Sequence, residues 1–500
     1  MSALAVPSAL SATDFFITPE GAGDKSGSTW ENAMGTAEFL TKLTWEGANK
    51  TADAHTVNAF LFATGTYTFN STGFVFNSGL TLKGGYDPAT GEAATSGRTV
   101  FDGNKKERSN GAFFLQPNTL QNADGKKRTI SISNIDFENF VANGVWRGGD
   151  TNWNYGYASA LYIVKCGYAE IVDCNFRNNA STATGTYKDD NQSGTNQTKE
   201  MAGAVSLNRV NTIFRNCSFI GNSGNQGGAV KLFYNMGGGV EKNLYTTFDG
   251  CYFADNKTTD CGGAIYGRHT QQINVINSTI VGNDAKMGGG IYSNAPGYYD
   301  NVVNIVSSTI GGNTATDAGP EVYTNGTGVL NVTNSIIVNG ADGFAVADAS
   351  ATTSYKFLGN NFVGKVAEGY TSTESDNISE NNTYASIFGD NVAKDGTLRP
   401  VKFVEGMNPD EISTIVTGEN WPYTVDVAVD QQGNARSAMT TAGALAVNKD
   451  SITTGGVDSL ISDTDADTDE SWYTLMGVRL TDRPTVSGLY IHKGRKVMIR

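Results

Sequence analysis

Residues with the chemistry for catalysis or metal binding are few and scattered in this chain. Its three histidines, His55, His269 and His492, lie far apart and lack the spacing of metal ligands, so we expect no metal site. The sequence contains neither a Gly-x-Ser-x-Gly nucleophile motif nor a phosphate-binding glycine loop. These residues therefore indicate no nucleophile and no metal centre.

Aromatic and basic residues recur at one place in a repeated motif, two residues after a small residue. Lys231, Tyr266, Tyr292 and Tyr323 hold this position, and Arg268 stands two residues beyond Tyr266. Rings flanked by arginine and amides can stack on sugar rings and bond to hydroxyls. We take these five residues as candidate carbohydrate-binding residues. The alternative is that the tyrosines only stabilise the fold, by roughly 0.2–1 kcal/mol per stacked pair.

A polysaccharide lyase is the second functional class to weigh. Such an enzyme needs a base to remove the C5 proton and usually calcium to neutralise the uronate. Lys231 or Arg268 could supply the base, but the aligned repeats hold no carboxylates for calcium. Asp189 and Asp190, in the insertion at residues 181–200, are the remaining candidates. We favour non-catalytic binding and expect no cofactor, with calcium only in the case of a lyase.

The carboxylates of DTDADTDE, residues 463–470, alternate as in a calcium-binding loop. Thr468 and Thr474 stand where such a loop requires glycine and glutamate. We therefore interpret residues 448–471 as a solvated acidic linker that precedes a short C-terminal β segment, residues 472–500.

Two short motifs that recur together predict the fold. The first reads CNFRNN, CSFIGN, CYFADN, STIVGN and STIGGN between residues 174 and 313, and the second reads GGAVK, GGAIY, GGGIY and GPEVY. A repeat of this kind, with only short β-type runs, cannot bury an apolar face alone, so its copies must stack. We predict an all-β protein in which residues 13–447 form a right-handed, single-stranded parallel β-helix.

In such a fold, equivalent residues of successive coils lie about 4.8 Å apart, so a column in the alignment becomes a row in space. We expect Ala264 and Tyr266 to point outward and the turn asparagines, such as Asn256 and Asn283, to adopt the left-handed conformation and bond to one another. Cysteines stacked in register are too far apart for disulfides, so we expect five free thiols. Strand alternation places these residues inward: Phe176, Phe219, Phe253, Ile280, Ile310, Val230, Ile265, Ile291, Val322, Cys174, Cys217 and Cys251.

The ends of the chain have their own signals. We interpret residues 1–12, MSALAVPSALSA, as a truncated signal peptide because of their small and apolar residues, and the alternative is a flexible N-terminal arm. Ser28 and Glu31 form a capping box before apolar residues at helical spacing. We expect this helix to cover the open end of the first coil.

The paired motifs resemble the repeats of polymorphic outer-membrane proteins and of related right-handed parallel β-helix, pectate-lyase-like proteins. The opening PEGAGDKSGSTWENA and the closing DQQGNAR and GALAV are similar to the first and last coils of secreted bacterial β-helix proteins of the choice-of-anchor type. This resemblance spans about residues 14–447. It implies the fold, but the resembling proteins include adhesins, passenger domains and polysaccharide lyases.

The C-terminal tail resembles the end of a type IX secretion sorting domain. The matching positions are Gly477, Gly488, Tyr490, Gly494 and Val497, although the tail is shorter than a full sorting module. The resemblance implies a contact with the secretion machinery.

Charge and hydropathy exclude other partners. The net charge is −14 and the pI is about 4.8, which argues against a nucleic-acid partner. No stretch has the 18 or so apolar residues of a membrane helix, so we expect no transmembrane segment. We therefore expect a secreted or outer-membrane surface protein of a Gram-negative bacterium, adhesin-like, that binds a polysaccharide or cell-surface glycan.

Overall fold

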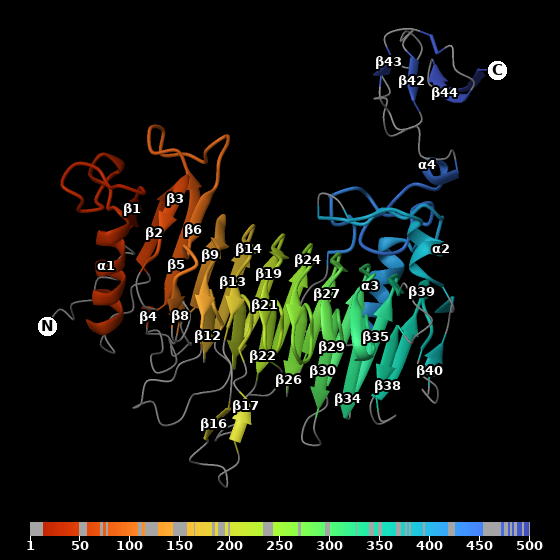
Figure 1. The fold of residues 1–500 in the computed structure, drawn as a ribbon, viewed down its shortest axis with the longest axis horizontal. Coiled ribbons are helices and arrows are strands. Elements are labelled where there is room, and N and C mark those ends of the chain that lie inside the picture. Colours follow the sequence, from red (N-terminus) through yellow and green to blue (C-terminus); the bar gives the residue numbers. More distant parts are fainter. Residues whose placement is uncertain are drawn as a thin grey trace, which may run out of the picture.

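A computed structural model of the chain shows a long solenoid of stacked strands (Figure 1). It describes residues 14–49, 58–70, 74–76, 79–108, 113–115, 129–143, 158–164, 166–182, 186–188, 196–198, 201–233, 244–268, 272–295, 301–326, 328–339, 345–348, 353–366, 372–375, 378–379, 382–393, 396–418, 426–453, 472–474, 479–480, 483–484, 488–492 and 495–499.

The solenoid is a right-handed parallel β-helix, as predicted, and four parallel sheets run along it. Sheet I has twelve strands, in spatial order β1 (Asp14–Ile17), β2 (Asn58–Ala63), β5 (Leu80–Tyr86), β9 (Thr129–Ser133), β13 (Tyr168–Val172), β19 (Asn211–Arg215), β23 (Tyr245–Asp249), β27 (Gln272–Ile276), β31 (Asn301–Val306), β35 (Gly328–Thr333), β38 (Thr353–Leu358) and β40 (Ser372–Ser375). Sheet II has eleven, β3 (Gly65–Thr68), β6 (Thr99–Asp102), β10 (Ile135–Glu138), β14 (Asn175–Arg177), β20 (Ser218–Ile220), β24 (Tyr252–Ala254), β28 (Thr279–Val281), β32 (Thr309–Gly311), β36 (Ile336–Val338), β39 (Asn361–Val363) and β41 (Ile378–Ser379).

The other two sheets complete each coil. Sheet III has seven short strands, β7 (Glu107–Arg108), β11 (Val141–Ala142), β15 (Ala180–Ser181), β21 (Ser223–Gly224), β25 (Lys257–Thr258), β29 (Asp284–Met287) and β33 (Thr314–Ala318). Sheet IV has nine, β4 (Phe74–Phe76), β8 (Phe113–Leu115), β12 (Leu161–Val164), β18 (Val205–Asn208), β22 (Val230–Phe233), β26 (Ile265–Arg268), β30 (Ile291–Ala295), β34 (Val322–Gly326) and β37 (Val346–Asp348). The chain passes through sheets I, II, III and IV in that order.

Antiparallel pairing occurs outside the solenoid. Strands β16 (Thr186–Lys188) and β17 (Asn196–Thr198) form a hairpin within the 181–200 insertion. The C-terminal segment forms a small antiparallel sheet from β42 (Trp472–Thr474), β43 (Arg479–Leu480), β44 (Gly488–His492) and β45 (Arg495–Ile499). It follows α4 (Lys449–Thr453), and the acidic run at 463–470 lies outside the described residues.

The core is built from columns of identical side chains. The rings of Phe137, Phe176, Phe219 and Phe253 stack in parallel, with centroids 5.0, 4.9 and 4.6 Å apart. These separations match the spacing of hydrogen-bonded strands, so each ring lies on its equivalent in the next coil. The predicted inward column of phenylalanines is confirmed.

The recurrent asparagines form what we call the asparagine ladder, made of Asn179, Asn222, Asn256, Asn283 and Asn313. Each is buried at the corner between sheets II and III, and the Nδ2 of each of the first four donates to the Oδ1 of the next at 2.8–3.0 Å. The Oδ1 of each of the last four also accepts the backbone N–H of the preceding ladder residue, as Asn283 does from Asn256 at 2.9 Å. The predicted turn position and amide ladder are confirmed.

The expected left-handed conformation of the ladder residues is wrong. That conformation belongs to the residue just before each of them, such as Asn178 and Asp255 with φ of 54° and 56°, and Gly221, Gly282 and Gly312 in the other coils. The physical reason is that one residue must turn the chain while the next points inward to reach its partners. The turn and the ladder are therefore made by two different residues.

The column of Cys174, Cys217, Cys251, Ser278 and Ser308 is also buried, and all five cysteines of the chain are free thiols. The Sγ of Cys251 donates to the carbonyl of Phe214 in the preceding coil, and the Oγ of Ser278 does the same to Phe248 at 3.2 Å. The cysteine thiol and the serine hydroxyl thus make the same hydrogen bond to the preceding coil. The prediction of no disulfides is confirmed.

Ala264 does not point outward, as strand alternation had indicated. It is fully buried in the main core, beside the equally buried Ile265. The cause is that β26 begins only at Ile265, whereas Gly262, Gly263 and Ala264 form a bend to which the two-residue alternation of a strand does not apply.

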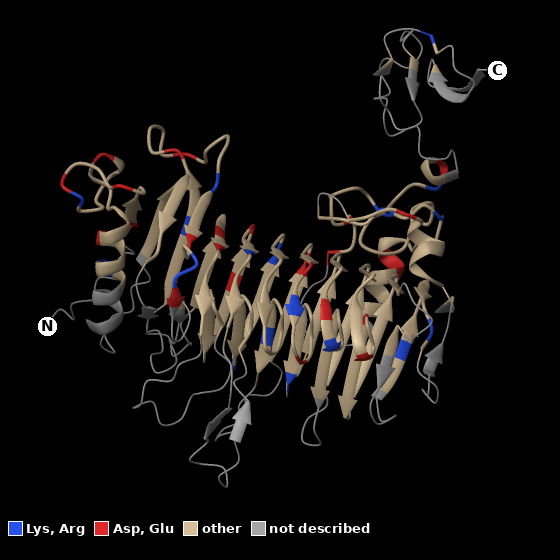
Figure 2. Cartoon of the chain, viewed as in Figure 1, with Lys and Arg blue, Asp and Glu red and all other residues tan. Residues whose placement is uncertain are grey.

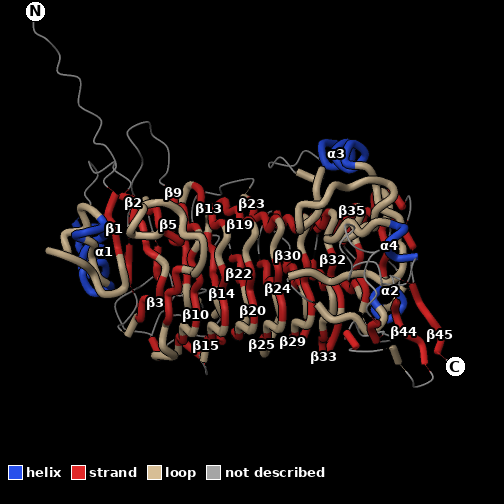
Figure 3. The backbone as a smooth tube through the Cα atoms, turned by 90° about the horizontal axis from the view of Figure 1, so that it is seen from above, coloured by secondary structure: helices blue, strands red, loops and turns tan. Residues whose placement is uncertain are grey.

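Helix α1 (Thr36–Asn49) lies at the N-terminal end of the solenoid, as expected (Figure 3). Phe39 and Leu43 enter the main core and cover its first coil. The helix begins eight residues later than the predicted capping box at Ser28. A 3-10 turn, η1 (Trp30–Asn32), precedes it, and no side chain caps that turn.

The described residues between 382 and 447 fold back over the outside of the solenoid, and we call them the C-terminal clasp. Helix α2 (Tyr384–Phe388) packs Ile387 and Phe388 against sheet II. Helix α3 (Pro409–Gly418) packs Ile412 against Val306, the last residue of β31 in sheet I. Figure 3 shows α2 and α3 near the end of the solenoid opposite α1. Among the described residues, no helix has the length and apolar character needed to cross a membrane.

A buried arginine holds the clasp to the corner between sheets I and II. The Nη2 of Arg436 donates to the Oδ1 of Asn277 at 2.9 Å, and the Nδ2 of Asn277 donates to the carbonyl of Asp426 at 3.0 Å. Burial lowers the pKa of Arg436 to about 10. The backbone N–H of Ala444 bonds to Thr309 Oγ1 at 2.9 Å. The clasp is thus bonded to two successive coils.

Glu321 ends the asparagine ladder. Its carboxyl is fully buried and accepts bonds from both the backbone N–H and the Nδ2 of Asn313. Burial raises the pKa of Glu321 well above its ordinary value, although the N–H groups of Asn313 and Gly312 oppose the shift. The glutamate of GPEVY therefore replaces, in the core, the amide that another asparagine would have supplied.

Replacement of Asn256 by leucine should destabilise the protein by roughly 3 kcal/mol, because the Asn222 amide and the Phe219 carbonyl would lose their buried partner. Chemical denaturation would measure the change. The control is Asp255→Gly at the neighbouring left-handed residue, which should stay within about 1 kcal/mol of the wild type. Equal losses in both variants would contradict a special role for the ladder.

Stability should fall as the pH rises through the range where Glu321 is ionised only in the unfolded chain. Because its folded pKa is raised, unfolding releases a proton above the ordinary glutamate pKa, and the loss reaches at most about 1.4 kcal/mol per pH unit. Glu321→Gln should keep the bonds to Asn313 and remove this slope. The free energies of unfolding of both proteins, measured from pH 4 to 8, should diverge with pH. Parallel curves would contradict the assignment.

Candidate functional site

The structure brings together the aromatic column predicted as a binding strip. Lys231, Tyr266, Tyr292 and Tyr323 are in-register partners on β22, β26, β30 and β34 of sheet IV. The tyrosine rings stack with centroids 5.3 and 5.5 Å apart and interplanar angles of 4° and 8°. The adjacency that the repeat indicated is therefore present.

The rings lack the open faces that the predicted stacking on sugars requires. Tyr266, Tyr292 and Tyr323 are only 2%, 4% and 8% exposed. They form an outer cluster with Cys261 and, partly buried, Met287 and Ala318, from the segments that lead into sheet IV. Burial also raises the pKa of Tyr292 above its ordinary value. The column is a covered seam of the fold and not an open platform for a sugar.

The two basic candidates lie at one end of this seam. The Nζ of Lys231 is 5.5 Å from the ring centre of Phe233 and 5.6 Å from that of Tyr266, and the guanidinium of Arg268 is 5.8 Å from Phe233. Lys231 is fully buried. Cations over aromatic faces stabilise such clusters. The lysine is therefore not placed to act as a base on a polymer at the surface, and Asp189, Asp190, His55 and His269 lie outside the described residues.

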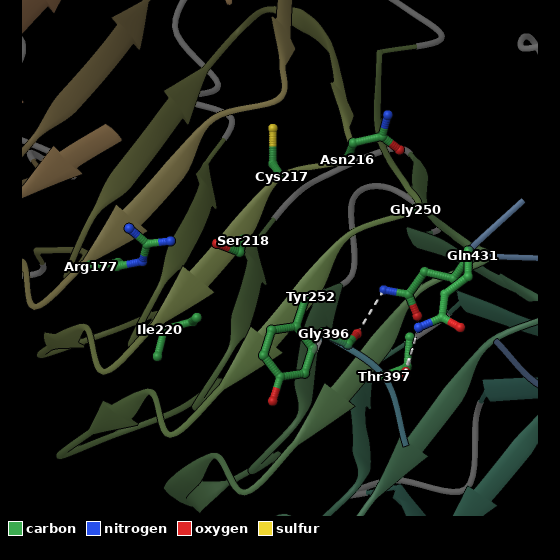
Figure 4. Close-up of a pocket in the computed structure, with 11 residues that line it drawn as sticks. Arg177, Asn216, Cys217, Ser218, Ile220, Gly250, Tyr252, Gly396, Thr397 and Gln431 are labelled. Atoms are coloured by element: carbon green, nitrogen blue, oxygen red, sulfur yellow. Dashed lines mark hydrogen bonds between the residues drawn. The ribbon is translucent and has the colours of Figure 1, made fainter. Parts of the chain in front are cut away.

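A second candidate site is a surface cleft of about 490 Å³ on the outer face of sheet II, bordered by the C-terminal clasp (Figure 4). Its floor comes from β20 and β24, which supply Ser218, Ile220 and Tyr252. Arg177 of β14 lies toward the N-terminal side. The remaining lining comes from the corner residues Asn216, Cys217 and Gly250 and from the clasp residues Gly396, Thr397, Gln431 and Gln432.

The floor is positioned by the same repeat that builds the core. Ser218 and Tyr252 of the floor are in register with each other, on β20 and β24, and with Asn175 of β14, which borders the cleft without lining it. Each stands directly before an inward phenylalanine, so strand alternation turns it outward. These residues are not among the candidates that the sequence predicted, although they flank the phenylalanine in CNFRNN, CSFIGN and CYFADN. The alternation was the signal that could have found them.

The clasp wall is held in place by side-chain hydrogen bonds. The Nε2 of Gln431 donates to the carbonyls of Cys251 and Gly396 at 3.1 and 3.0 Å, and its Oε1 accepts from Thr279 Oγ1 at 2.6 Å. The carboxylate of Asp430 fixes the adjacent turn by accepting the backbone N–H groups of Gln432, Asn434 and Ala446 at 2.8–2.9 Å. A wall fixed in advance lowers the ordering cost of binding a ligand.

An ion-pair cluster borders the cleft on its N-terminal side. Arg177 Nη1 lies 3.1 Å from Asp136 Oδ2 and 3.0 Å from Glu138 Oε1. Arg98 Nη2 lies 2.7 Å from Asp136 Oδ1, and Asn175 Nδ2 donates to the same oxygen at 2.6 Å. The Asp136 side chain is only 3% exposed. Both carboxylates next to the cleft are therefore engaged by arginine.

The open part of the cleft combines a ring with polar groups. Tyr252 is half-buried, and burial raises its pKa, with a further contribution from the negative charge of Asp255. Ser218 and Thr397 supply hydroxyls and Gln432 an amide, whose Nε2 lies 3.4 Å from Thr397 Oγ1. The part of the chain that the structure describes contains no group of three or more His, Cys, Asp or Glu residues that could hold a metal ion.

Comparison with known proteins does not place the chain in a family. No family model matches it, and no curated protein matches its sequence significantly. The stacked parallel strands confirm a β-helix built from repeats. This fold is the part of the sequence resemblances that the structure supports. The finer resemblances, to polymorphic outer-membrane repeats, choice-of-anchor proteins and a type IX sorting domain, stay predictions.

Replacement of both Tyr266 and Tyr292 by alanine should lower the melting temperature, because two buried rings are lost from the sheet IV seam. The expected cost is on the order of 3 kcal/mol or more. The matched control is the double replacement by phenylalanine, which keeps the stack and should remain within about 1 kcal/mol of the wild type. An unchanged melting temperature in the alanine variant would show that the rings do not support the fold.

Proposed function

We propose that the protein is a non-catalytic, adhesin-like protein that binds a glycan in the cleft between sheet II and the C-terminal clasp. The observation that carries the proposal is the lining of the cleft, in which the ring of Tyr252 lies among hydroxyls, amides and the guanidinium of Arg177. Sugars present apolar ring faces and many hydroxyls, and this combination of side chains matches both. The partner is then a polysaccharide or cell-surface glycan.

The proposed place of action is outside the cell, as a secreted protein or on the outer membrane of a Gram-negative bacterium. The support comes from the sequence resemblances to secreted β-helix proteins and to a type IX sorting tail. The C-terminal antiparallel sheet holds the matched Gly488 and Tyr490 in β44 and Val497 in β45. The proposed role of this tail is contact with the secretion machinery.

The proposal predicts that Tyr252→Ala lowers the affinity for the bound glycan about tenfold or more, equivalent to about 1.4 kcal/mol. A glycan array with the full chain would find the ligand, and calorimetry would measure the affinities. The matched control is Tyr245→Ala, because Tyr245 is a half-buried tyrosine of the same coil that does not line the cleft.

Two results would overturn the proposal. Equal affinity of Tyr252→Ala and the wild type would remove the cleft as the binding site. Absorbance from unsaturated uronate products, after incubation with uronate polymers, would show a polysaccharide lyase in place of a binding protein.

A further inference from the structure

We infer that the cleft selects a neutral oligosaccharide laid along the solenoid axis, and excludes acidic polysaccharides such as polyuronates. This inference rests on the proposed function and specifies its ligand class. It is carried by the charges around Arg177 and by the register of the cleft floor.

The positive charge of Arg177 is already compensated. Its Nη1 contacts both Asp136 and Glu138, and Asp136 is shared with Arg98. Two arginines therefore face two carboxylates, and the cluster has no net charge to offer a ligand. A uronate carboxylate placed here would meet Asp136 and Glu138 as like charges at close range.

Arg177 can nevertheless still donate hydrogen bonds to a ligand. The bonds that Arg177 makes to the described residues use Nη1 alone, so Nε and Nη2 keep their N–H groups for a ligand. Its side chain is 37% exposed, and Figure 4 shows the guanidinium at the edge of the cleft. Such an arginine can donate to sugar hydroxyls and ring oxygens without needing an anion.

The rest of the lining and the whole chain agree with a neutral ligand. Arg177 is the only charged residue among those that line the cleft in the described part of the chain. The net charge of −14 disfavours approach of a polyanion. Figure 2 shows Lys and Arg residues interspersed with Asp and Glu residues along the solenoid.

The register of the floor sets the direction and length of the ligand. Ser218 and Tyr252 occupy one outward column of the lining on adjacent coils, at a spacing of about 4.8 Å, and Arg177 lies on the coil before them. A sugar chain parallel to the solenoid axis meets a polar or aromatic side chain at every coil. A single sugar meets only one, so an oligosaccharide binds more tightly than its monomer.

Calorimetry on the full chain with neutral cellohexaose, mannohexaose and maltohexaose, against hexagalacturonate, tests the selection. At least one neutral hexaose should bind at least tenfold more tightly than hexagalacturonate. Its Kd should change less than twofold between 50 and 500 mM NaCl, because no net charge is paired. Tighter, salt-sensitive binding of hexagalacturonate overturns this inference and leaves glycan binding standing. Binding of neither class at millimolar concentration overturns both.

A charge variant tests whether acidic ligands are excluded by the compensation of Arg177 or by the overall surface charge. Glu138→Gln removes one counter-charge of Arg177 without touching the cleft lining, so hexagalacturonate affinity should rise at least threefold while neutral binding stays within twofold. The matched control is Glu170→Gln, because Glu170 pairs with Arg215 on sheet I and neither residue lines the cleft. Equal rises in both variants, or none in Glu138→Gln, overturn the role given to the compensated arginine.

Discussion

The structure depends on the bonding of each side chain to its own equivalent in the next coil. The asparagine ladder shows this most directly, because every amide gives and receives bonds along the solenoid axis while it also satisfies a backbone N–H and a carbonyl at the corner. Buried backbone groups at a corner cannot reach water, so an amide that serves both coils removes a large penalty. A shift of one residue in any coil would break these bonds on both sides.

The same register also determines which side chains point outward from sheet II. Because Phe176, Phe219 and Phe253 stack inward, their neighbours Asn175, Ser218 and Tyr252 must form a column outward. The floor of the cleft is therefore a consequence of the register of the core. Only the wall has a separate origin, in a clasp that is far away in sequence and attached through residues such as Gln431 and Arg436.

Departures from the repeat mark places where the solenoid changes. The repeat ends at GPEVY, where Glu321 takes over as the acceptor for Asn313. The clasp covers coils on both sides of this point, including Val306 and Val338, with its own apolar side chains. Glu321 thus stabilises the ladder at the point where the next asparagine is no longer available. This substitution replaces a neutral amide with a titratable group in a site that disfavours charge.

The sequence by itself determined the coil, because a repeat of small, apolar and asparagine residues fits one stacked geometry. The inward phenylalanines, the free cysteines and the tyrosine neighbours followed from that periodicity alone. Periodicity says which residues are equivalent but not what covers them, so the burial of Tyr266 and Tyr292 was decided by contacts with Cys261 and Met287 outside the strand. The cleft was likewise decided by tertiary structure, because Tyr252 and Gln431 are joined only when the clasp folds back, and no local pattern records that long-range packing.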